Sequence, residues 1–178
     1  MAILIRQERI EQFPLFVDYG QLAKSKEFGA CKANFKRHKL PTPKVVNVSQ
    51  WGRFISSGLT DRRKRIFEDA FLPGRNMMFL LIGASYAYRV NAQSVAIGLL
   101  DESKAIFPDQ TRAFCDEAEK LLSTILGRTI EITTPLMRFS KVDVVRAANR
   151  MKIRHTYSCH AGTKKPCGVC VACREFRF

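Results

Sequence analysis

Four cysteines near the C-terminal end constrain this chain more than any other feature. Cys159, Cys167, Cys170 and Cys173 follow the pattern C-x7-C-x2-C-x2-C, with Gly168 directly after the second cysteine. Two overlapping Cys-x-x-Cys steps let backbone N–H groups turn back toward the sulfur atoms, and the earlier cysteine completes a tetrahedral set. Four thiolates leave no open coordination position, so the pattern predicts a structural Zn²⁺ site. A redox dithiol pair or incidental cysteines are the alternatives.

Length and composition are those of an ordinary globular protein. The chain has 178 residues, of which 46% are apolar and 26% charged, so one domain with a full core is expected. It has no run of eighteen apolar residues, and residues 1–8 are too short and too charged for a signal peptide. We therefore expect a cytoplasmic protein without membrane contact. In such a protein six cysteines favour metal binding over disulfides, which leaves Cys31 and Cys115 as core or surface thiols.

The charge balance is strongly basic. Thirty Lys and Arg residues against sixteen Asp and Glu residues give a formal net charge of +14, so an anionic partner is expected. The basic residues are scattered, and the densest run, 62–65, carries no RNA-binding signature. The run 62–65 is typical of a solvated loop, so direct binding to nucleic acid is not expected. A nucleotide triphosphate substrate would also account for part of the charge.

Short β-type runs alternate with helical patterns along the chain. Strands are expected at 15–17, 45–48, 94–99 and 130–133, and helices at 22–38, 75–90, 109–126 and 141–151. This order predicts an α/β fold, with a mostly parallel Rossmann-like sheet, helices on both faces and ligands beyond the carboxyl ends of the strands. Helix 75–90 is apolar on nearly every side and is expected to be buried. Residues 49–73, rich in Gly, Ser and charge, are expected to form a mobile loop.

Several segments resemble one enzyme family in order and spacing. They are 16–21 (FVDYGQ), 57–60 (SGLT), 72–76 (LPGRN), 97–98 (IG), 107–109 (FPD), 135–136 (PL), 140–141 (SK) and 156–159 (TYSC), followed by the cysteine triplet. Over about residues 14–178 the chain resembles the 7-cyano-7-deazaguanine synthases (QueC-like), members of the adenine-nucleotide alpha-hydrolase-like superfamily. The resemblance implies an α/β nucleotide-hydrolase-like domain at 1–152 and a zinc-binding segment at 153–178 packed on it.

The resemblance also implies an ATP-dependent carbon–nitrogen ligase of queuosine biosynthesis. ATP, with Mg²⁺, activates the carboxylate of 7-carboxy-7-deazaguanine, ammonia displaces AMP to give an amide, and a second ATP-driven dehydration yields the nitrile. A homodimer is implied as well. The family opens with a strand and a Ser-Gly-Gly-x-Asp-Ser phosphate loop that does not occur in this sequence. Residues 56–61 are the nearest match to this phosphate loop, but they contain a single Gly. We therefore expect either an N-terminally shortened sequence of an active synthase or a family member that has lost ATP chemistry.

Candidate residues for binding substrate or ATP lie first around two turns. Asp18, Tyr19 and Gln21 follow the first expected strand, where side chains leave a parallel sheet toward the ligand crevice. A polar cap on the strand is the alternative. Arg75 and Asn76 follow a Pro-Gly turn and open a helix, so their donors can meet phosphate or ribose oxygens. Simple capping of that helix is the competing interpretation.

Further candidates follow the third expected strand, which closes on Gly98. Asp101, Ser103 and Asp109 are placed to bind the amino and ring N–H groups of a deazaguanine, although Asp109 also suits a helix cap. Lys141 can neutralise a carboxylate or phosphate, and its setting between Ser and Asp also reads as a capping box. No residue is assigned a catalytic role. The three histidines, expected to be bystanders, are His38, His155 and His160.

Three functions from different classes remain. The first is the ATP-dependent synthase, with zinc holding the C-terminal segment against the crevice. The second is a catalytically silent, zinc-stabilised relative that serves as a subunit or binding protein. The third is a basic zinc module that binds tRNA, for which a steep salt dependence and a sequence preference would be required.

Overall fold

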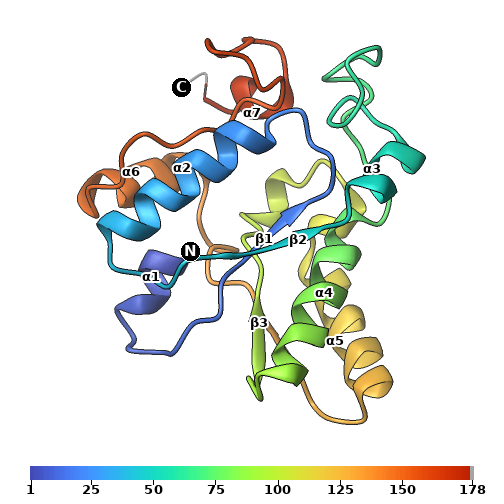
Figure 1. Ribbon diagram of the computed structural model, residues 1–178, viewed down its shortest axis with the longest axis vertical. Coiled ribbons are helices and arrows are strands. Elements are labelled where there is room, and N and C mark those ends of the chain that lie inside the picture. The colour runs from blue at the N-terminus through green and yellow to red at the C-terminus, as the bar shows by residue number, and fades with distance from the viewer. Residues whose placement is uncertain (177–178) are drawn as a thin grey trace.

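Two short parallel ladders form the β structure of the computed structural model, which describes residues 1–176 (Figure 1). Strand β1 (Leu15–Asp18) pairs with β2 (Lys44–Asn47), and β3 (Ser94–Ala96) pairs with β4 (Glu131–Thr133). All four expected strands are present and both pairings are parallel, so the α/β class is confirmed. Within the described part of the chain, however, the strands form two separate two-stranded sheets.

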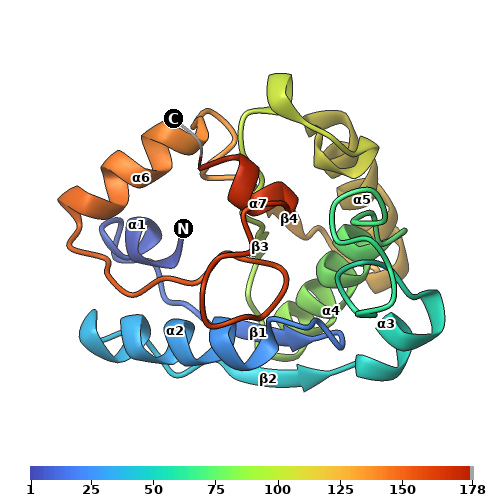
Figure 2. The ribbon, with the colours of Figure 1, turned by 90° about the horizontal axis from the view of Figure 1, so that it is seen from above.

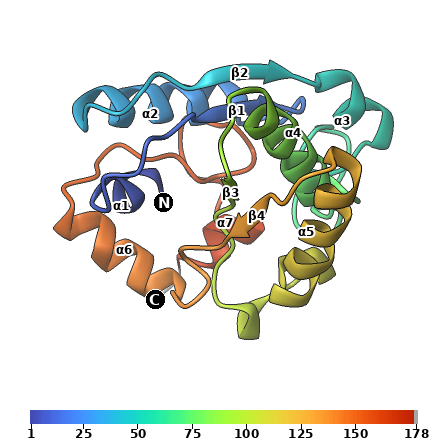
Figure 3. The ribbon, with the colours of Figure 1, turned by 90° about the horizontal axis from the view of Figure 1, so that it is seen from below.

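Helices surround these ladders. They are α1 (Ala2–Arg6), α2 (Lys24–Arg37), α3 (Ser49–Ile55), α4 (Arg75–Arg89), α5 (Arg112–Leu126), α6 (Lys141–Arg150) and α7 (Val171–Arg174), with 3₁₀ turns η1 (Glu102–Lys104) and η2 (Pro108–Gln110). Seen from below, α4 and α5 lie to one side of β3 and β4, and α1 and α6 lie to the other (Figure 3). Local signals fix the ends of α5, because Thr111 accepts a hydrogen bond from the Phe114 N–H and Gly127 ends the helix at φ 64°.

The main core lies where α4 and α5 cover β3 and β4. Its buried side chains include Leu80, Ala84, Leu122, Ile130 and Ile132. Each of the two helices, however, buries one face. Leu81 and Tyr88 on α4 are 43% and 54% exposed, and Leu121 and Ile125 on α5 are 51% and 59% exposed. The expectation of a fully buried helix at 75–90 is therefore wrong, since the packing covers one side of it.

Residues 49–73 are more structured than expected. They begin with α3, and Leu59 and Leu72 are buried in a second core with Tyr19, next to the partly buried Trp51. The expectation of a loop is therefore wrong for α3. Gly, Ser and charged residues dominate the composition of this segment, and they mask the few apolar residues that anchor it.

The C-terminal segment lies against several elements that are distant in sequence. The Asn34 amide on α2 donates to the Arg154 carbonyl oxygen at 2.9 Å, and the Arg174 guanidinium lies 3.5 Å from the centre of the Phe67 ring. Figure 2 shows this segment between α6 on one side and α4 and α5 on the other. Arg177 and Phe178, the last residues of the expected zinc segment, lie outside the described residues. Among residues 1–176, no helix combines the length and apolar character needed to cross a membrane.

Candidate metal centre and ligand crevice

The four C-terminal cysteines converge on one point. The sulfur atoms of Cys159, Cys167, Cys170 and Cys173 all lie within 4.8 Å of one another, and those of Cys167 and Cys173 are 4.0 Å apart. Sulfurs held about 2.3 Å from one tetrahedral zinc ion lie about 3.8 Å from each other, so the arrangement fits such an ion after a small contraction. The cluster can therefore hold a metal ion, as the cysteine spacing predicts.

Backbone N–H groups surround these sulfur atoms. The Cys167 N–H donates to the Cys159 sulfur at 3.3 Å, and the Cys170 N–H donates to the Cys167 sulfur at 3.4 Å. Burial raises the pKa of Cys159, but hydrogen bonds from the backbone of Cys167 and Ala161 and from the thiols of Cys167 and Cys173 bring it down to about 6. Burial raises the pKa of Cys173 to about 12. These hydrogen bonds favour the thiolate form of Cys159, and the charge of a bound metal ion would favour the thiolate form of the other three cysteines as well.

The polar residues at the end of β1 mainly hold their own turn. Asp18 is 2% exposed, accepts from the Gly20 N–H at 3.1 Å and forms an ion pair with Lys24 at 2.5 Å. The Gln21 amide donates to the Val17 carbonyl oxygen and to Glu27, each at 3.2 Å. These contacts match the strand-cap alternative for Asp18 and Gln21.

Buried Tyr19 and the half-buried, charged Arg75 and Glu27 interact beside this turn. The Arg75 guanidinium lies 5.8 Å from the centre of the Tyr19 ring. Burial raises the pKa of Tyr19. The positive charge of Arg75 lowers this pKa, and the negative charge of Glu27 raises it. Burial also raises the pKa of Glu27, while the hydrogen bond from Gln21 and the charge of Arg75 lower it. Sequence reasoning missed Glu27, since a single Glu among the lysines of α2 gives no signal.

A second group joins α4 to the segment after β3. The buried Asn76 amide donates to the backbone oxygen of Asp109 at 2.9 Å, so the start of α4 lies against η2. Asp101 caps η1 by accepting from the Ser103 N–H at 3.0 Å, and its own N–H donates to the Phe139 oxygen at 3.1 Å. Asp101 therefore lies near the start of α6.

The remaining predicted residues lie at the edges of this region. Gly98 is exposed two residues after β3, and Ser103 is exposed and contacts the group through Asp101. Lys141, at the start of α6, pairs with Glu175 at 2.9 Å and so connects α6 to the residue that follows α7. The structure thus brings Tyr19 and Arg75 together and joins Asn76 to Asp109.

His160 is a further residue in this region that sequence reasoning set aside. Its Nδ1 atom is shielded from solvent and has no hydrogen-bond partner within residues 1–176. Burial, followed by the charge of Arg75, lowers the pKa of His160, while Glu175 raises it and Lys141 lowers it further. These neighbours come from α4, α6 and the end of the chain. The adjoining cysteine was the available signal, because it places His160 next to the four-cysteine cluster.

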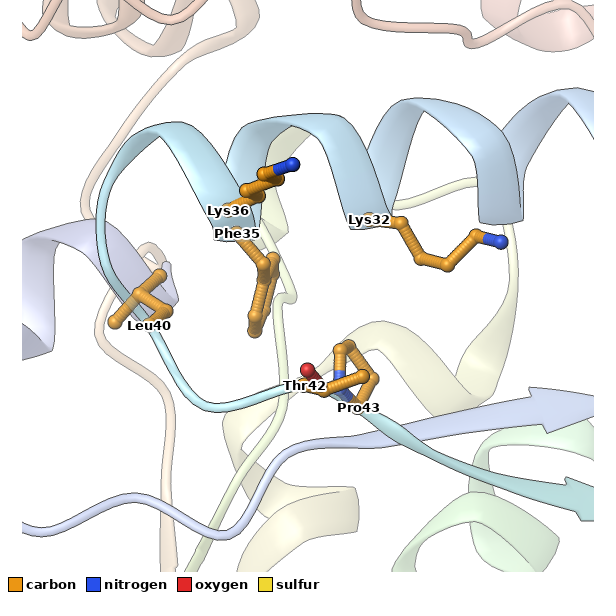
Figure 4. Close-up of a pocket in the computed structure, with 6 residues that line it drawn as sticks. All are labelled: Lys32, Phe35, Lys36, Leu40, Thr42 and Pro43. Atoms are coloured by element: carbon orange, nitrogen blue, oxygen red, sulfur yellow. The ribbon is translucent and has the colours of Figure 1, made fainter.

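A surface groove of about 410 Å³ lies elsewhere (Figure 4). The residues that line it come from the C-terminal half of α2 and the loop before β2, and they are Lys32, Phe35, Lys36, Leu40, Thr42 and Pro43. This loop leads into the amino end of β2, whereas ligands of parallel α/β sheets bind beyond the carboxyl ends. The groove contains none of the predicted site residues, so it is not the predicted crevice.

Residues 56–61, which imitate a phosphate loop, use their N–H donors within the protein. The Gly58 N–H donates to the Asp69 oxygen, and the Leu59 N–H donates to the Ser57 hydroxyl. The N–H groups of Thr60 and Asp61 both donate to the Ser57 backbone oxygen. A phosphate cradle needs free N–H groups that point at the ligand. This turn is therefore a closed structural turn.

Fold and site together define an α/β protein with parallel strands whose C-terminal four-cysteine cluster can hold a metal ion. A family model described as "Queuosine biosynthesis protein QueC" matches residues 1–177, and the chain belongs to this family. This confirms the resemblance drawn from the sequence and connects the chain with queuosine biosynthesis.

Relatives named 7-cyano-7-deazaguanine synthase align over most of the chain. The protein from Gloeothece citriformis is 34% identical over 145 residues, which cover 72% of this chain and 62% of that relative, less than two thirds of its length. The protein from Acetivibrio thermocellus is 30% identical over 93% of this chain and 80% of its own length. That from Prochlorococcus marinus strain MIT 9515 is 30% identical over 96% of this chain and 83% of its own.

Proposed function

We propose that the chain is a 7-cyano-7-deazaguanine synthase, an ATP-dependent ligase that converts 7-carboxy-7-deazaguanine and ammonia into the nitrile. The observation that carries this proposal is the position of the cysteine cluster. The segment that holds it lies against α2, and its His160 is close enough for the charges of Arg75 and Lys141 to act on its ring. A structural zinc ion held by the four cysteines would cross-link this segment and keep it beside the crevice.

The proposed chemistry removes both carboxylate oxygens in two ATP-dependent steps. One oxygen attacks the α-phosphorus of ATP bound with Mg²⁺ and releases pyrophosphate, and ammonia then displaces AMP to leave the amide. The amide oxygen is adenylated in turn, and loss of AMP and protons gives the nitrile. In this scheme Arg75 and Lys141 bind anionic oxygens, while Asp101 and Asp109 accept hydrogen bonds from the deazaguanine ring.

The test is direct formation of product. The purified chain is mixed with 7-carboxy-7-deazaguanine, ATP, Mg²⁺ and ammonia, and the nitrile and AMP are followed by mass spectrometry. Arg75→Ala should lower the rate about 10- to 100-fold, as expected for loss of a charge-assisted contact. Arg89→Ala, at the exposed last residue of the same helix, is the matched control and should leave the rate unchanged. Equal effects of the two variants would contradict the proposed role of Arg75.

A second candidate is a zinc-stabilised deazapurine-binding protein without ATP chemistry. One observation favours it, namely that the phosphate-loop-like turn at 57–61 has no spare N–H donor among Gly58 to Asp61. Under this alternative the chain binds the deazapurine with the same Arg75 dependence but forms no nitrile. A tRNA-binding module is not proposed, because within the basic run Arg63 pairs with Asp61 at 2.8 Å and Arg65 with Asp69 at 3.7 Å.

The proposal includes three broader features. Residues 1–152 would act as the α/β domain and 153–178 as the zinc segment. The reduced thiols that a thiolate metal site requires favour a cytoplasmic location. The family resemblance favours a homodimer, which sedimentation of the purified chain can test.

A further inference from the structure

Strand β2 forms an open edge of the molecule. Within residues 1–176 it pairs with β1 alone, and Figures 2 and 3 show it at the margin, outside β1. The N–H of Val48, directly after β2, donates to the Asp18 oxygen of β1 at 2.8 Å. In a parallel ladder every second residue bonds to the same neighbour, so the N–H and C=O groups of Val45 and Asn47 point away from β1. They form a short template to which a further strand can add.

This edge continues into the surface groove beside α2. Val45 is level with Phe16 in the ladder and so shares its face of the sheet, where the Phe16 ring centre lies 4.8 Å from that of Phe28 on α2. Val45 is nevertheless 49% exposed. The Phe35 ring points from α2 toward the loop that leads into β2 (Figure 4). Val45 and Phe35 thus provide apolar surface on the α2 side of β2, and together with the open edge they form the α2–β2 groove.

Three lysines around this groove have no carboxylate partner in the described part of the chain. Lys32 and Lys36 lie one turn apart on α2 and line the groove, and Lys44 is the first residue of β2. The lysines that form ion pairs within residues 1–176 are Lys24, Lys120 and Lys141. Residues 22–44 carry seven Lys or Arg residues against one Glu. This charge attracts an acidic occupant, whereas a second copy of the chain, with its net charge of +14, is repelled.

We propose that an acidic, extended segment of another protein adds to the open edge of β2 as a further strand and occupies the α2–β2 groove. Its backbone pairs with Val45 and Asn47, and its side chains alternate between the two faces of the sheet. Apolar side chains on the α2 face cover Val45. Carboxylates on the opposite face lie beside Lys44, whose ammonium is 5.1 Å from the centre of the Tyr86 ring. This docking site is separate from the crevice of the proposed synthase.

The test uses a fluorescent peptide of alternating glutamate and valine, Glu-Val-Glu-Val-Glu-Val-Glu, whose binding is followed by fluorescence anisotropy. One control peptide has lysine in place of glutamate, and another has N-methylated backbone amides that cannot pair with a strand. In the protein, Val45→Pro removes an outward N–H and leaves the bonds to β1 in place. Lys36→Glu reverses a charge of the groove. Lys26→Glu makes the same change at an exposed position of α2 outside it.

The expected result is that Val45→Pro weakens binding of the glutamate peptide about tenfold, as for the loss of one or two hydrogen bonds. Lys36→Glu should weaken it about threefold or more. Lys26→Glu should leave it unchanged at about 0.15 M salt, where distant charges are screened. Neither control peptide should bind. If the melting temperature shows that Val45→Pro has disturbed the fold, the two lysine variants and the N-methylated peptide decide the outcome.

Several outcomes would overturn the proposal. They are absence of binding by the glutamate peptide, equal binding of its N-methylated form, and equal effects of Lys36→Glu and Lys26→Glu. Sedimentation tests a second copy as the occupant, and self-association that Val45→Pro abolishes would assign the edge to that copy instead. A single-stranded RNA oligonucleotide tests nucleic acid. Tighter binding of this RNA than of the peptide, weakened by Lys36→Glu but not by Val45→Pro, would assign the lysines to nucleic acid and likewise overturn the proposal.

Discussion

Two glycines with similar backbone conformations show how a single residue controls the docking of the segment that carries the cysteine cluster. Gly162 has φ +67° and Gly127 has φ +64°, a region in which L side chains are strained. They differ in their surroundings. The position of a Cβ on Gly127 is open, whereas a Cβ on Gly162 would collide with the Leu22 backbone. The contact between the segment and the turn just before α2 therefore depends on the missing side chain at Gly162.

This difference predicts unequal costs of the same substitution. Both Gly127→Ala and Gly162→Ala should lower the free energy of unfolding by about 1 kcal/mol through backbone strain. Gly162→Ala should lose about 1–3 kcal/mol more, because the segment must shift away from the Leu22 backbone. Urea denaturation of the two variants measures the difference. Equal losses would mean that the segment does not rest on Leu22.

Asn76 and Asp109 allow stability to be separated from binding. The Asn76 amide bonds to the backbone oxygen of Asp109, so Asp109→Ala leaves this hydrogen bond in place. We expect Asp109→Ala to weaken binding of 7-carboxy-7-deazaguanine about tenfold with little change in stability. Asn76→Ala should instead cost about 1–3 kcal/mol of unfolding free energy, because it removes a hydrogen bond made by the buried Asn76 side chain. Denaturation and calorimetry on both variants check this, and a stability loss in Asp109→Ala would mean that its side chain supports the fold.

At the level of helices and strands, local sequence signals were sufficient for most of the fold. Apolar spacing predicted the four long helices to within a few residues, and the capping box read from Ser140 and Asp143 is present at the start of α6. Burial was harder to predict, since periodicity does not reveal that Leu81 and Tyr88 on α4 face solvent. Whether an apolar residue is covered depends on tertiary packing, which local patterns do not contain.

In the candidate site, too, local sequence signals pointed to some residues, whereas others depend on tertiary contacts. The strand-end rule selected Tyr19 as a candidate and the Pro-Gly turn selected Arg75, because both rules follow from local order along the chain, and the two side chains lie side by side in the structure. Glu27 and His160 were missed, since each joins the site through contacts between α2, α4 and the C-terminal segment. The cysteine cluster was predictable because its ligands are close in sequence.

The capping box of α6 predicts a measurable pH effect. Hydrogen bonds from the side chain and backbone of Ser140 lower the pKa of Asp143 below its ordinary 3.8. A carboxyl with a lowered pKa stabilises the fold above its ordinary value, and this contribution is lost as the pH falls through the folded-state pKa. Ser140→Ala should raise the pKa of Asp143 back toward 3.8, and NMR titration of this carboxyl measures it. Ser85→Ala, at an exposed position within α4, should leave it unchanged.

For the molecule as a whole, the cysteine cluster connects regions that the chain order keeps apart. Its segment bonds to α2 through Asn34, to α6 through the pair Lys141–Glu175 and to the 49–73 region through Arg174 and Phe67. Loss of the proposed zinc ion should therefore loosen the crevice as well as the C-terminal segment, because the bound metal supplies folding free energy to the surrounding chain.

Metal removal tests this coupling. We expect one zinc ion per chain, and release by a chelator should become easier as the pH falls. The direction of this pH effect follows from Cys159, whose pKa is lowered from its ordinary 9.0 to about 6. The thiolate of Cys159 therefore stabilises the fold fully above pH 9.0, and this stabilisation is lost as the pH falls through about 6. Hydrogen exchange of the metal-free protein should rise within 157–176 and also around Leu22 and Lys141, and affinity for 7-carboxy-7-deazaguanine should fall. Cys167→Ser should reproduce these effects, whereas Cys31→Ser, outside the cluster, should not. Faster exchange confined to 157–176, with unchanged ligand affinity, would show that the metal stabilises its own segment without supporting the crevice.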